Sequence, residues 1–423
     1  SIKKEFYMKK YSSFLIVFLL SIILGGQTSL AEEQVYQAAA EHAIAIEVET
    51  GKILYEKNAH SPASVASISQ LLTTYLVYEA IEEGKLTMDS PVAISDFPYK
   101  LTLNTEISNV LLESREYTVE QLLRASLIVS ANSATIALAE KVAGSEKAFV
   151  DLMREKVQSW GIGDATIVNA TGLNNSYLGD ERYPGTGKED ENKFSAAAIA
   201  LIARRLVLDH PQVLDITSQQ SLTMDGHTYY GGHGMLEGKP YQRAGVDGLK
   251  TGYSATAGAS LVTTVDQQNM RVLTVILNAD HSDIDPDYRY IATTNLLNYV
   301  AQHFQSITYL GQGQAFDDSS IEIFNGRVDT SPVVAQRDFR IPIKRSAVEL
   351  PTASFKSVEG PLEAPLKKGT AAGRLWLHDS DLIGKGYIQE QPSLEMVIEK
   401  EVKADIWPVS WWNYFVRYVN EKL

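Results

Sequence analysis

Alternating apolar and polar positions near the start of the chain predict a pair of strands. Residues 43–48, AIAIEV, are followed by Thr50-Gly51 and by the apolar run 53–55. This is the order expected for two strands joined by a tight turn. Residues 257–265 and 270–278 alternate in the same way around a polar turn. They predict a second hairpin beside the segment that contains Lys250.

Helical periodicity fills the segment between the two hairpins. Ala66 to Glu83 predicts a helix that stops at Gly84, and Thr118 with Gln121 predicts a capping box at the start of another. Further helices are expected over 134–142, 195–209 and 288–304. Strands at both ends with helices between them predict an α+β domain over residues 36–305, in which helices flank one antiparallel sheet.

Residues 306–402 show a different pattern. Short alternating runs are separated by clusters of Gly, Pro and Asp, and helical periodicity is almost absent. The runs are 320–324, 339–343, 374–377 and 393–398. A small all-β domain is predicted, and because no catalytic group of residues stands out in it, we interpret it as a spacer or interaction domain.

Residues 404–423 predict an amphipathic helix. Polar residues recur on one side, and aromatic and aliphatic residues, including Trp411, Trp412 and Phe415, fill the other. Such a face suits the boundary between lipid headgroups and acyl chains, and the segment lacks the run of about 20 apolar residues that a membrane span needs. A helix that docks on its own domain is the alternative.

The first 31 residues have the layout of a secretory signal peptide. Lys9 and Lys10 precede an apolar stretch over 14–24, and Ser29-Leu30-Ala31 has the small-x-small form of a cleavage site. On this interpretation translation starts at Met8, residues 1–7 are an upstream extension, and the mature chain is exported.

Composition narrows the possible functions. A chain of 423 residues with 44% hydrophobic content is long enough for two domains. It contains no cysteine, so a disulfide framework and a thiol nucleophile are excluded. The formal net charge of −14 comes without a concentrated basic patch, so nucleic acid is not expected as a partner.

Three short motifs carry the candidate chemistry. They are Ser67-Ile68-Ser69-Gln70, Ser130-Ala131-Asn132 and Lys250-Thr251-Gly252, in that order. Penicillin-binding proteins and class A β-lactamases use S-x-x-K, S-D-N and K-T-G in the same order. Each motif alone is common, and only the ordered set indicates a site.

In these motifs and their context the chain resembles the low-molecular-mass penicillin-binding proteins that are D-alanyl-D-alanine carboxypeptidases (peptidase family S11), the streptococcal ones in particular. The resemblance extends over nearly all of the predicted mature chain, through the β domain to the Trp411-Trp412-Asn413 segment. It implies the penicillin-binding-protein fold, shared with serine β-lactamases, and no cofactor or metal. It also implies peptidoglycan pentapeptide stems as substrates, β-lactams as covalent inhibitors, and anchoring of the terminal helix to the outer face of the cytoplasmic membrane.

The resemblance also gives the residues their roles. Ser67 is implied as the nucleophile, with the backbone N–H groups of Ser67 and Tyr253 as the oxyanion hole. Ser130 would pass a proton to the leaving D-alanine, and Asn132 would hold the substrate amide. The segment Lys250-Thr251-Gly252 would engage the terminal carboxylate.

Gln70 departs from the motif, which has lysine at this position. A carboxamide cannot accept a proton near neutral pH as a lysine with a lowered pKa can. Three interpretations stay open: a slow enzyme in which Lys250 acts through Ser130, a non-catalytic homologue that binds peptidoglycan or β-lactam, and a variant of an active parent. A β-lactamase fits less well, because the β domain and terminal helix are foreign to that class.

Overall fold

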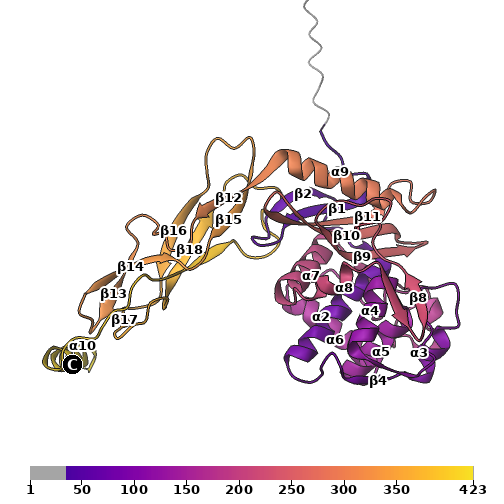
Figure 1. Ribbon diagram of the computed structural model, residues 1–423, viewed down its shortest axis with the longest axis horizontal. Helices are drawn as coiled ribbons and strands as arrows, with labels where there is room; N and C mark the ends of the chain where they lie inside the picture. The colour runs from indigo at the N-terminus through magenta and orange to yellow at the C-terminus, as the bar shows by residue number, and fades with distance from the viewer. Residues whose placement is uncertain (1–34, 423) are drawn as a thin grey trace, which may run out of the picture. The chain divides into compact units, whose positions relative to one another are not determined.

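The computed structural model describes residues 35–422, so the predicted signal peptide lies outside the described residues. A large hydrophobic core is built from residues between Ile44 and Leu277, and a second from residues between Leu310 and Val402. Helices and strands mix in the first region, and strands dominate the second (Figure 1).

A five-stranded antiparallel sheet organises the first region. Its strands are β1 Ala40–Glu47, β2 Ile53–Lys57, β9 Val246–Ser254, β10 Gly258–Gln267 and β11 Met270–Ala279, in the order β2-β1-β11-β10-β9. Both predicted hairpins are confirmed, and β1 pairs with β11, with Ile44 opposite Val275. The segment with the third motif is β9, which lies at the edge of the sheet.

Helices cover both faces of this sheet. Figure 1 shows α9 on one face and the helices around α2 and α4 on the other. The helices are α2 Gln70–Glu82, α3 Asp96–Leu101, α4 Val119–Val129, α5 Asn132–Ala143, α6 Glu146–Ser159, α7 Ala196–Asp209, α8 Val213–Thr217 and α9 Tyr288–His303. The Thr118–Gln121 capping box at the start of α4 is confirmed, with both reciprocal hydrogen bonds present.

Short elements connect these helices. The strands are β3 Ala63–Ser64, β4 Pro91–Ala93, β5 Glu116–Thr118, β6 Lys193–Phe194, β7 Ser221–Met224 and β8 His227–Tyr230. The 3₁₀ turns are η1 Ala66–Ser69, η2 Asn175–Tyr177 and η3 Gly179–Glu181.

The predicted helix over Ala66 to Glu83 is wrong in its first turn, which is the 3₁₀ turn η1. Ala66 has a positive φ of 49°, which is incompatible with an α-helix. Gly172 lies against this turn: a Cβ atom there would be 1.8 Å from the Ala66 carbonyl oxygen, and its own φ is +86°. Only glycine allows this approach, so packing against a distant loop decides the shape of the turn that carries Ser67.

The second region consists of strands. They are β12 Phe304–Leu310, β13 Ser320–Phe324, β14 Thr330–Ala335, β15 Phe339–Lys344, β16 Thr352–Ser357, β17 Leu362–Glu363, β18 Ala371–His378 and β19 Ser393–Ile398. Six of them form a sheet in the order β16-β18-β19-β14-β13-β17, and β12 pairs with β15. The four strands predicted here are confirmed as β13, β15, β18 and β19, and the other four were not predicted.

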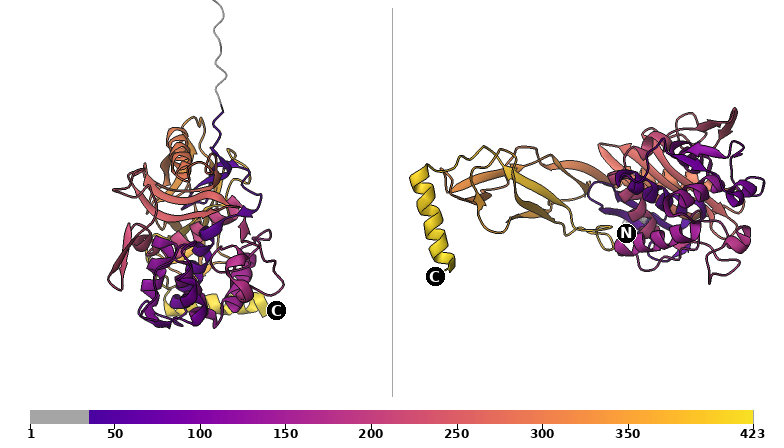
Figure 2. Two further views of the ribbon diagram at one scale, coloured as in Figure 1. Left: turned by 90° about the vertical axis from the view of Figure 1, so that its right-hand side faces the viewer. Right: turned by 90° about the horizontal axis from the view of Figure 1, so that it is seen from below.

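Helix α10, Trp407–Lys422, follows this region and meets the end of it that carries β13 and β17 (Figures 1 and 2). Polar and aromatic residues make the contacts. Asn413 Nδ2 donates to Asn325 Oδ1 at 3.4 Å, Arg417 Nη1 pairs with Glu363 Oε2 at 3.3 Å, and the Tyr414 ring packs edge-on against Phe324. Its aromatic side is exposed, with Trp407, Trp411 and Trp412 between 56 and 79% accessible. Within residues 35–422, no helix combines the length and apolar content of a membrane-crossing segment.

Candidate active site

The three predicted motifs, far apart in the chain, meet at one cleft of about 650 Å³. Turn η1, the junction of α4 with α5, and the edge strand β9 each form part of its wall. The predicted site residues that line it are Ser67, Ser130, Asn132, Thr251, Gly252 and Tyr253. The other two, Gln70 and Lys250, are buried and contact residues of this wall.

Strand β9 approaches the turn that carries Ser67 closely. A Cβ atom on Gly252 would lie 2.7 Å from the Val65 carbonyl oxygen and 3.3 Å from the Ile68 nitrogen. These distances exclude any larger residue unless the backbone shifts. The glycine of the third motif therefore brings the edge of the sheet against the serine of the first.

Gln70 is fully buried and is bonded away from Ser67. Its Nε2 donates to Asn132 Oδ1 and to the Thr171 carbonyl oxygen, both at 3.3 Å, and its Oε1 accepts from Ser126 Oγ at 3.4 Å. Among the described residues, no hydrogen bond joins it to Ser67. These bonds are long and therefore weak, but they satisfy a neutral carboxamide that has no proton-accepting role.

Lys250 is an amine in contact with the second motif. It is 1% exposed, and its Nζ donates to Ser130 Oγ and to the Thr251 carbonyl oxygen. Burial lowers the pKa of Lys250 to about 7, and the positive charge of Arg289 adds to the effect. A substantial fraction of this amine is therefore neutral near pH 7 and can accept a proton.

Ser130 and Asn132 lie at a sharp reversal of the chain. Ser130 is left-handed, with φ 58°, at the end of α4, and Asn132 is the first residue of α5. The backbone nitrogen and Nδ2 of Asn132 both donate to the Ser108 carbonyl oxygen, at 3.0 and 2.9 Å. These bonds fix the reversal, so that both residues of the second motif face the same cleft.

Arg289 is a cleft residue that the sequence did not reveal. It lies in the first turn of α9, lines the cleft, and donates from Nη1 to the Gly252 carbonyl oxygen at 3.3 Å. Its position depends on α9 packing over the sheet, and no motif in the sequence marks it.

Glu191 is buried, which the composition of its segment did not predict. The stretch Lys188 to Glu191 has the composition of a solvated loop, yet the Glu191 side chain is buried and lines the cleft. Its oxygens accept hydrogen bonds from Asn174 Nδ2 and Ser254 Oγ, both at 3.2 Å. The sequence gives no signal for this burial, because the partners lie 17 and 63 residues away.

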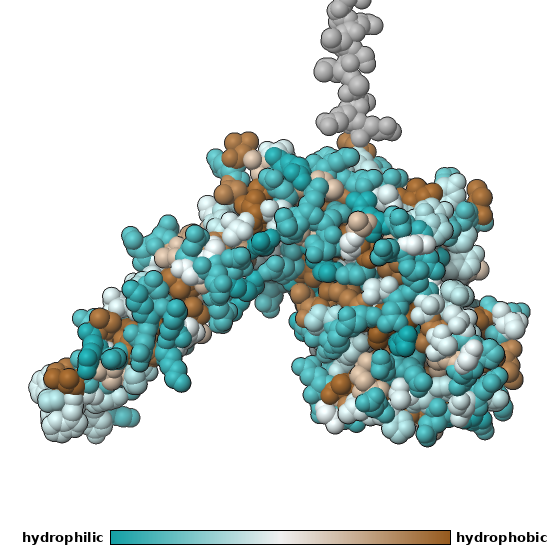
Figure 3. Space-filling model, viewed as in Figure 1, coloured by the Kyte–Doolittle hydropathy of each residue, from teal (hydrophilic) through white to brown (hydrophobic). Residues whose placement is uncertain are grey.

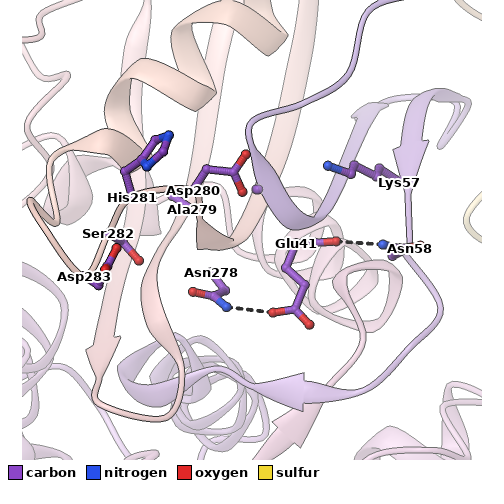
Figure 4. Close-up of a pocket in the computed structure, with 10 residues that line it drawn as sticks. Glu41, Lys57, Asn58, Asn278, Ala279, Asp280, His281, Ser282 and Asp283 are labelled. Atoms are coloured by element: carbon purple, nitrogen blue, oxygen red, sulfur yellow. Dashed lines mark hydrogen bonds between the residues drawn. The ribbon is translucent and has the colours of Figure 1, made fainter.

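Asp280 and His281 are residue types found in serine-protease catalytic triads, but they lie outside the cleft that contains Ser67. They line a separate pocket of about 480 Å³ together with Glu41 and Lys57 (Figure 4). This pocket shares no lining residue with the cleft that contains Ser67. The pair therefore has no part in the chemistry of that cleft.

Comparison with known proteins assigns the family. Residues 28–281 match the family model for D-alanyl-D-alanine carboxypeptidases, and residues 304–404 match that for the C-terminal domain of penicillin-binding protein 5. The first match covers more than half of the chain. The chain belongs to the D-alanyl-D-alanine carboxypeptidase family. The predicted family and α+β fold are thereby confirmed.

Comparison with individual proteins gives the same family. The chain is similar to a peptidoglycan synthesis regulatory factor (PBP3) from Streptococcus pneumoniae, with a TM-score of 0.84 and 50% identity, covering 87% of this chain and 100% of that one. D-alanyl-D-alanine carboxypeptidase DacC from Escherichia coli is 27% identical over 92% of this chain and 93% of its own. Penicillin-binding protein D2 from Listeria monocytogenes, in its ampicillin-bound form, has a TM-score of 0.52 and 25% identity, covering 63% of this chain and 99% of that one.

Proposed function

We propose that this family member removes the terminal D-alanine from peptidoglycan pentapeptides through an acyl-enzyme on Ser67, slowly because Gln70 occupies the position of the motif lysine. The observation that carries the proposal is the cleft itself. It combines Ser67 on a tight turn with Ser130, which is hydrogen-bonded to an amine that is partly neutral near pH 7. Strand β9, at the edge of the sheet, forms another part of the wall.

The substrate would bind along the edge strand β9. An extended peptide can add to such an edge through backbone hydrogen bonds. Its terminal carboxylate would lie near Thr251 and the guanidinium of Arg289, next to the amine of Lys250, which is only partly protonated near pH 7. The oxygen of its scissile carbonyl would then accept hydrogen bonds from the backbone N–H groups of Ser67 and Tyr253. The side chain of Asn132 would hydrogen-bond to the preceding amide.

Acylation requires an acceptor for the Ser67 proton. As Oγ of Ser67 forms a bond to the carbonyl carbon, the proton would pass through the Ser130 hydroxyl to the neutral amine of Lys250. The same relay would protonate the nitrogen of the leaving D-alanine as the C–N bond breaks. Water would then hydrolyse the ester and return Ser67 to its hydroxyl form.

Gln70 limits the rate of this sequence. Loss of a general base typically lowers a rate by about 10²–10⁴-fold. The remaining groups still bind and polarise the substrate, so residual acylation is expected.

A non-catalytic protein that binds peptidoglycan or β-lactam is the second candidate, and Gln70 favours it. The carboxamide is tied to Asn132, Thr171 and Ser126 and completes the wall of the cleft without supplying a base. Such a protein would bind the peptide or the β-lactam without hydrolysing it.

Two measurements on the full chain separate these candidates. Release of D-alanine from a pentapeptide tests turnover, and a fluorescent penicillin tests covalent trapping, as the ampicillin-bound Listeria relative suggests. We expect a slowly formed, stable penicillin adduct and slow D-alanine release, both lost in Ser67→Ala. An adduct without D-alanine release would support the second candidate, and rapid penicillin turnover would indicate a β-lactamase.

We further propose that residues 36–305 carry the catalysis, that residues 306–402 act as a spacer, and that α10 rests on the outer face of the cytoplasmic membrane. The support for the last point is the orientation of α10. Asn413, Tyr414 and Arg417 contact the β region, and Trp407, Trp411 and Trp412 are left more than half exposed. In Figure 3 the end of the chain that holds α10 is mostly pale, with one brown group. Docking on its own domain and binding to a membrane are thus compatible.

A further inference from the structure

Glu191 places a carboxylate in the wall of the cleft without a cationic partner. The side chain is 5% exposed, and its two oxygens accept from neutral donors, Asn174 Nδ2 and Ser254 Oγ. Within residues 35–422, no ion pair includes it. A buried carboxylate held by neutral groups alone gains from a cation that comes within hydrogen-bond distance of it.

Charge is divided along the cleft. Lys250 and Arg289 lie beside Thr251 and Gly252. The lining carboxylates are Glu191, beside Ser254, and the exposed Glu106 and Glu189. A ligand that fits both ends therefore carries a negative group at one end and a positive group at the other.

The strand fixes the separation of these two groups. Thr251 and Ser254 are three residues apart on β9, which corresponds to about 10 Å along a strand. A peptide that runs antiparallel to β9, with its terminal carboxylate at Thr251, reaches Ser254 with the third residue from its carboxyl end. The side chain of this residue is the one that comes within range of Glu191.

We propose that Glu191 is a specificity-determining residue: it favours peptides in which the residue before D-alanyl-D-alanine has a side-chain ammonium group. This inference rests on the proposed function, because it takes the carboxylate position and the direction of the peptide from it. Glu106 and Glu189, which are exposed, would attract the same cation more weakly, since solvent and salt screen them.

The test compares two peptides that differ only in that charge. Nα-acetyl-L-lysyl-D-alanyl-D-alanine and its Nε-acetylated counterpart are titrated calorimetrically into the full chain, whose slow turnover leaves them intact during the measurement. We expect the free amine to bind about tenfold more tightly, as for one charge-assisted hydrogen bond. In Glu191→Gln, which keeps an acceptor oxygen for one of the two neighbouring donors and removes the charge, the ratio should fall to about one.

Glu155→Gln is the matched control, because Glu155 is an exposed glutamate on α6 outside the cleft and the substitution removes the same charge. It should keep the tenfold ratio. A purely structural role of Glu191 would weaken both peptides equally in Glu191→Gln and leave the ratio unchanged, which would overturn the inference. Equal affinities in the unaltered chain would overturn it too, while the proposed function would stand. Binding of neither peptide, with no penicillin adduct, would overturn the proposed function itself.

Discussion

The cleft region buries polar side chains, whereas the terminal helix α10 exposes large aromatic ones. Around the cleft, polar side chains are inside: Gln70, Asn132 and Lys250 are at most 2% exposed. On α10, large aromatic side chains are outside, and Trp407 is 79% exposed. Both arrangements cost free energy in an isolated soluble protein, since buried polar groups lose water and exposed rings keep it ordered.

The two regions offset this cost differently. The buried polar groups satisfy one another: Gln70 bonds to Asn132, and Lys250 bonds to Ser130. The rings of α10 pack partly on each other, as Trp411 stacks on Phe415 with centroids 5.6 Å apart, but each ring stays between 43 and 79% exposed. The first arrangement has its main polar contacts within the chain and suits a small ligand, whereas the second needs an external apolar surface.

The largest expected effect comes from changing the buried polar set. Gln70→Lys should raise the rate of Ser67 acylation by about 10²–10⁴-fold, because it restores a titratable amine one turn from the hydroxyl. The rate of labelled-penicillin adduct formation measures it. Gln158→Lys, on the surface of α6, is a control for the added charge. Equal rates for the chain and Gln70→Lys would show that the existing relay already supplies the base.

The exposed apolar set gives the next effect. Replacing Trp411, Trp412 and Phe415 by Ala should lower partitioning to anionic lipid vesicles on the order of 100-fold, since each ring loses part of a burial free energy of about 1.5–3 kcal/mol. Vesicle sedimentation measures the partitioning. Alanine at Val328, Val348 and Leu350, which are exposed apolar residues of the β region, is the control and should change little. Unchanged sedimentation of the α10 variant would assign membrane binding to another segment.

Removing the buried amine of Lys250 should have a smaller and more selective effect. Lys250→Ala should weaken peptides with a free terminal carboxylate by about 1.5–3 kcal/mol, or roughly 10- to 150-fold, relative to their amidated analogues. Inhibition constants for matched peptide pairs measure it. Lys368→Ala, at an exposed position of the β region, should leave the difference intact. Equal losses for acid and amide would contradict a role for Lys250 in carboxylate binding.

The pH dependence should show the smallest change. Burial lowers the pKa of Lys250 to about 7, so the neutral, proton-accepting form grows as the pH rises through 7. Penicillin acylation of the unaltered chain should therefore rise about tenfold between pH 6 and pH 8, following the fraction of neutral amine. Labelling with fluorescent penicillin, stopped at set times at each pH, measures this rate. A rate that does not change with pH would exclude Lys250 as the proton acceptor.

Much of the fold could be predicted because its signals are local. The alternation in 43–48 and 270–278 specifies strands, and the Thr118–Gln121 box specifies a helix start, each within a few residues. The 3₁₀ turn at Ala66 could not be predicted in this way. The turn packs against Gly172, which is more than a hundred residues away in the chain.

The sequence by itself determined the family, the order of the three motifs and the absence of lysine at position 70, because these depend only on which residues occur and in what order. Tertiary structure alone decided what surrounds them. Packing buried Lys250 against Ser130 and lowered its pKa, turned Gln70 toward Asn132, and brought Arg289 and Glu191 to the cleft. Burial and charge proximity are properties of neighbours in space, and these neighbours come from segments that the sequence keeps far apart.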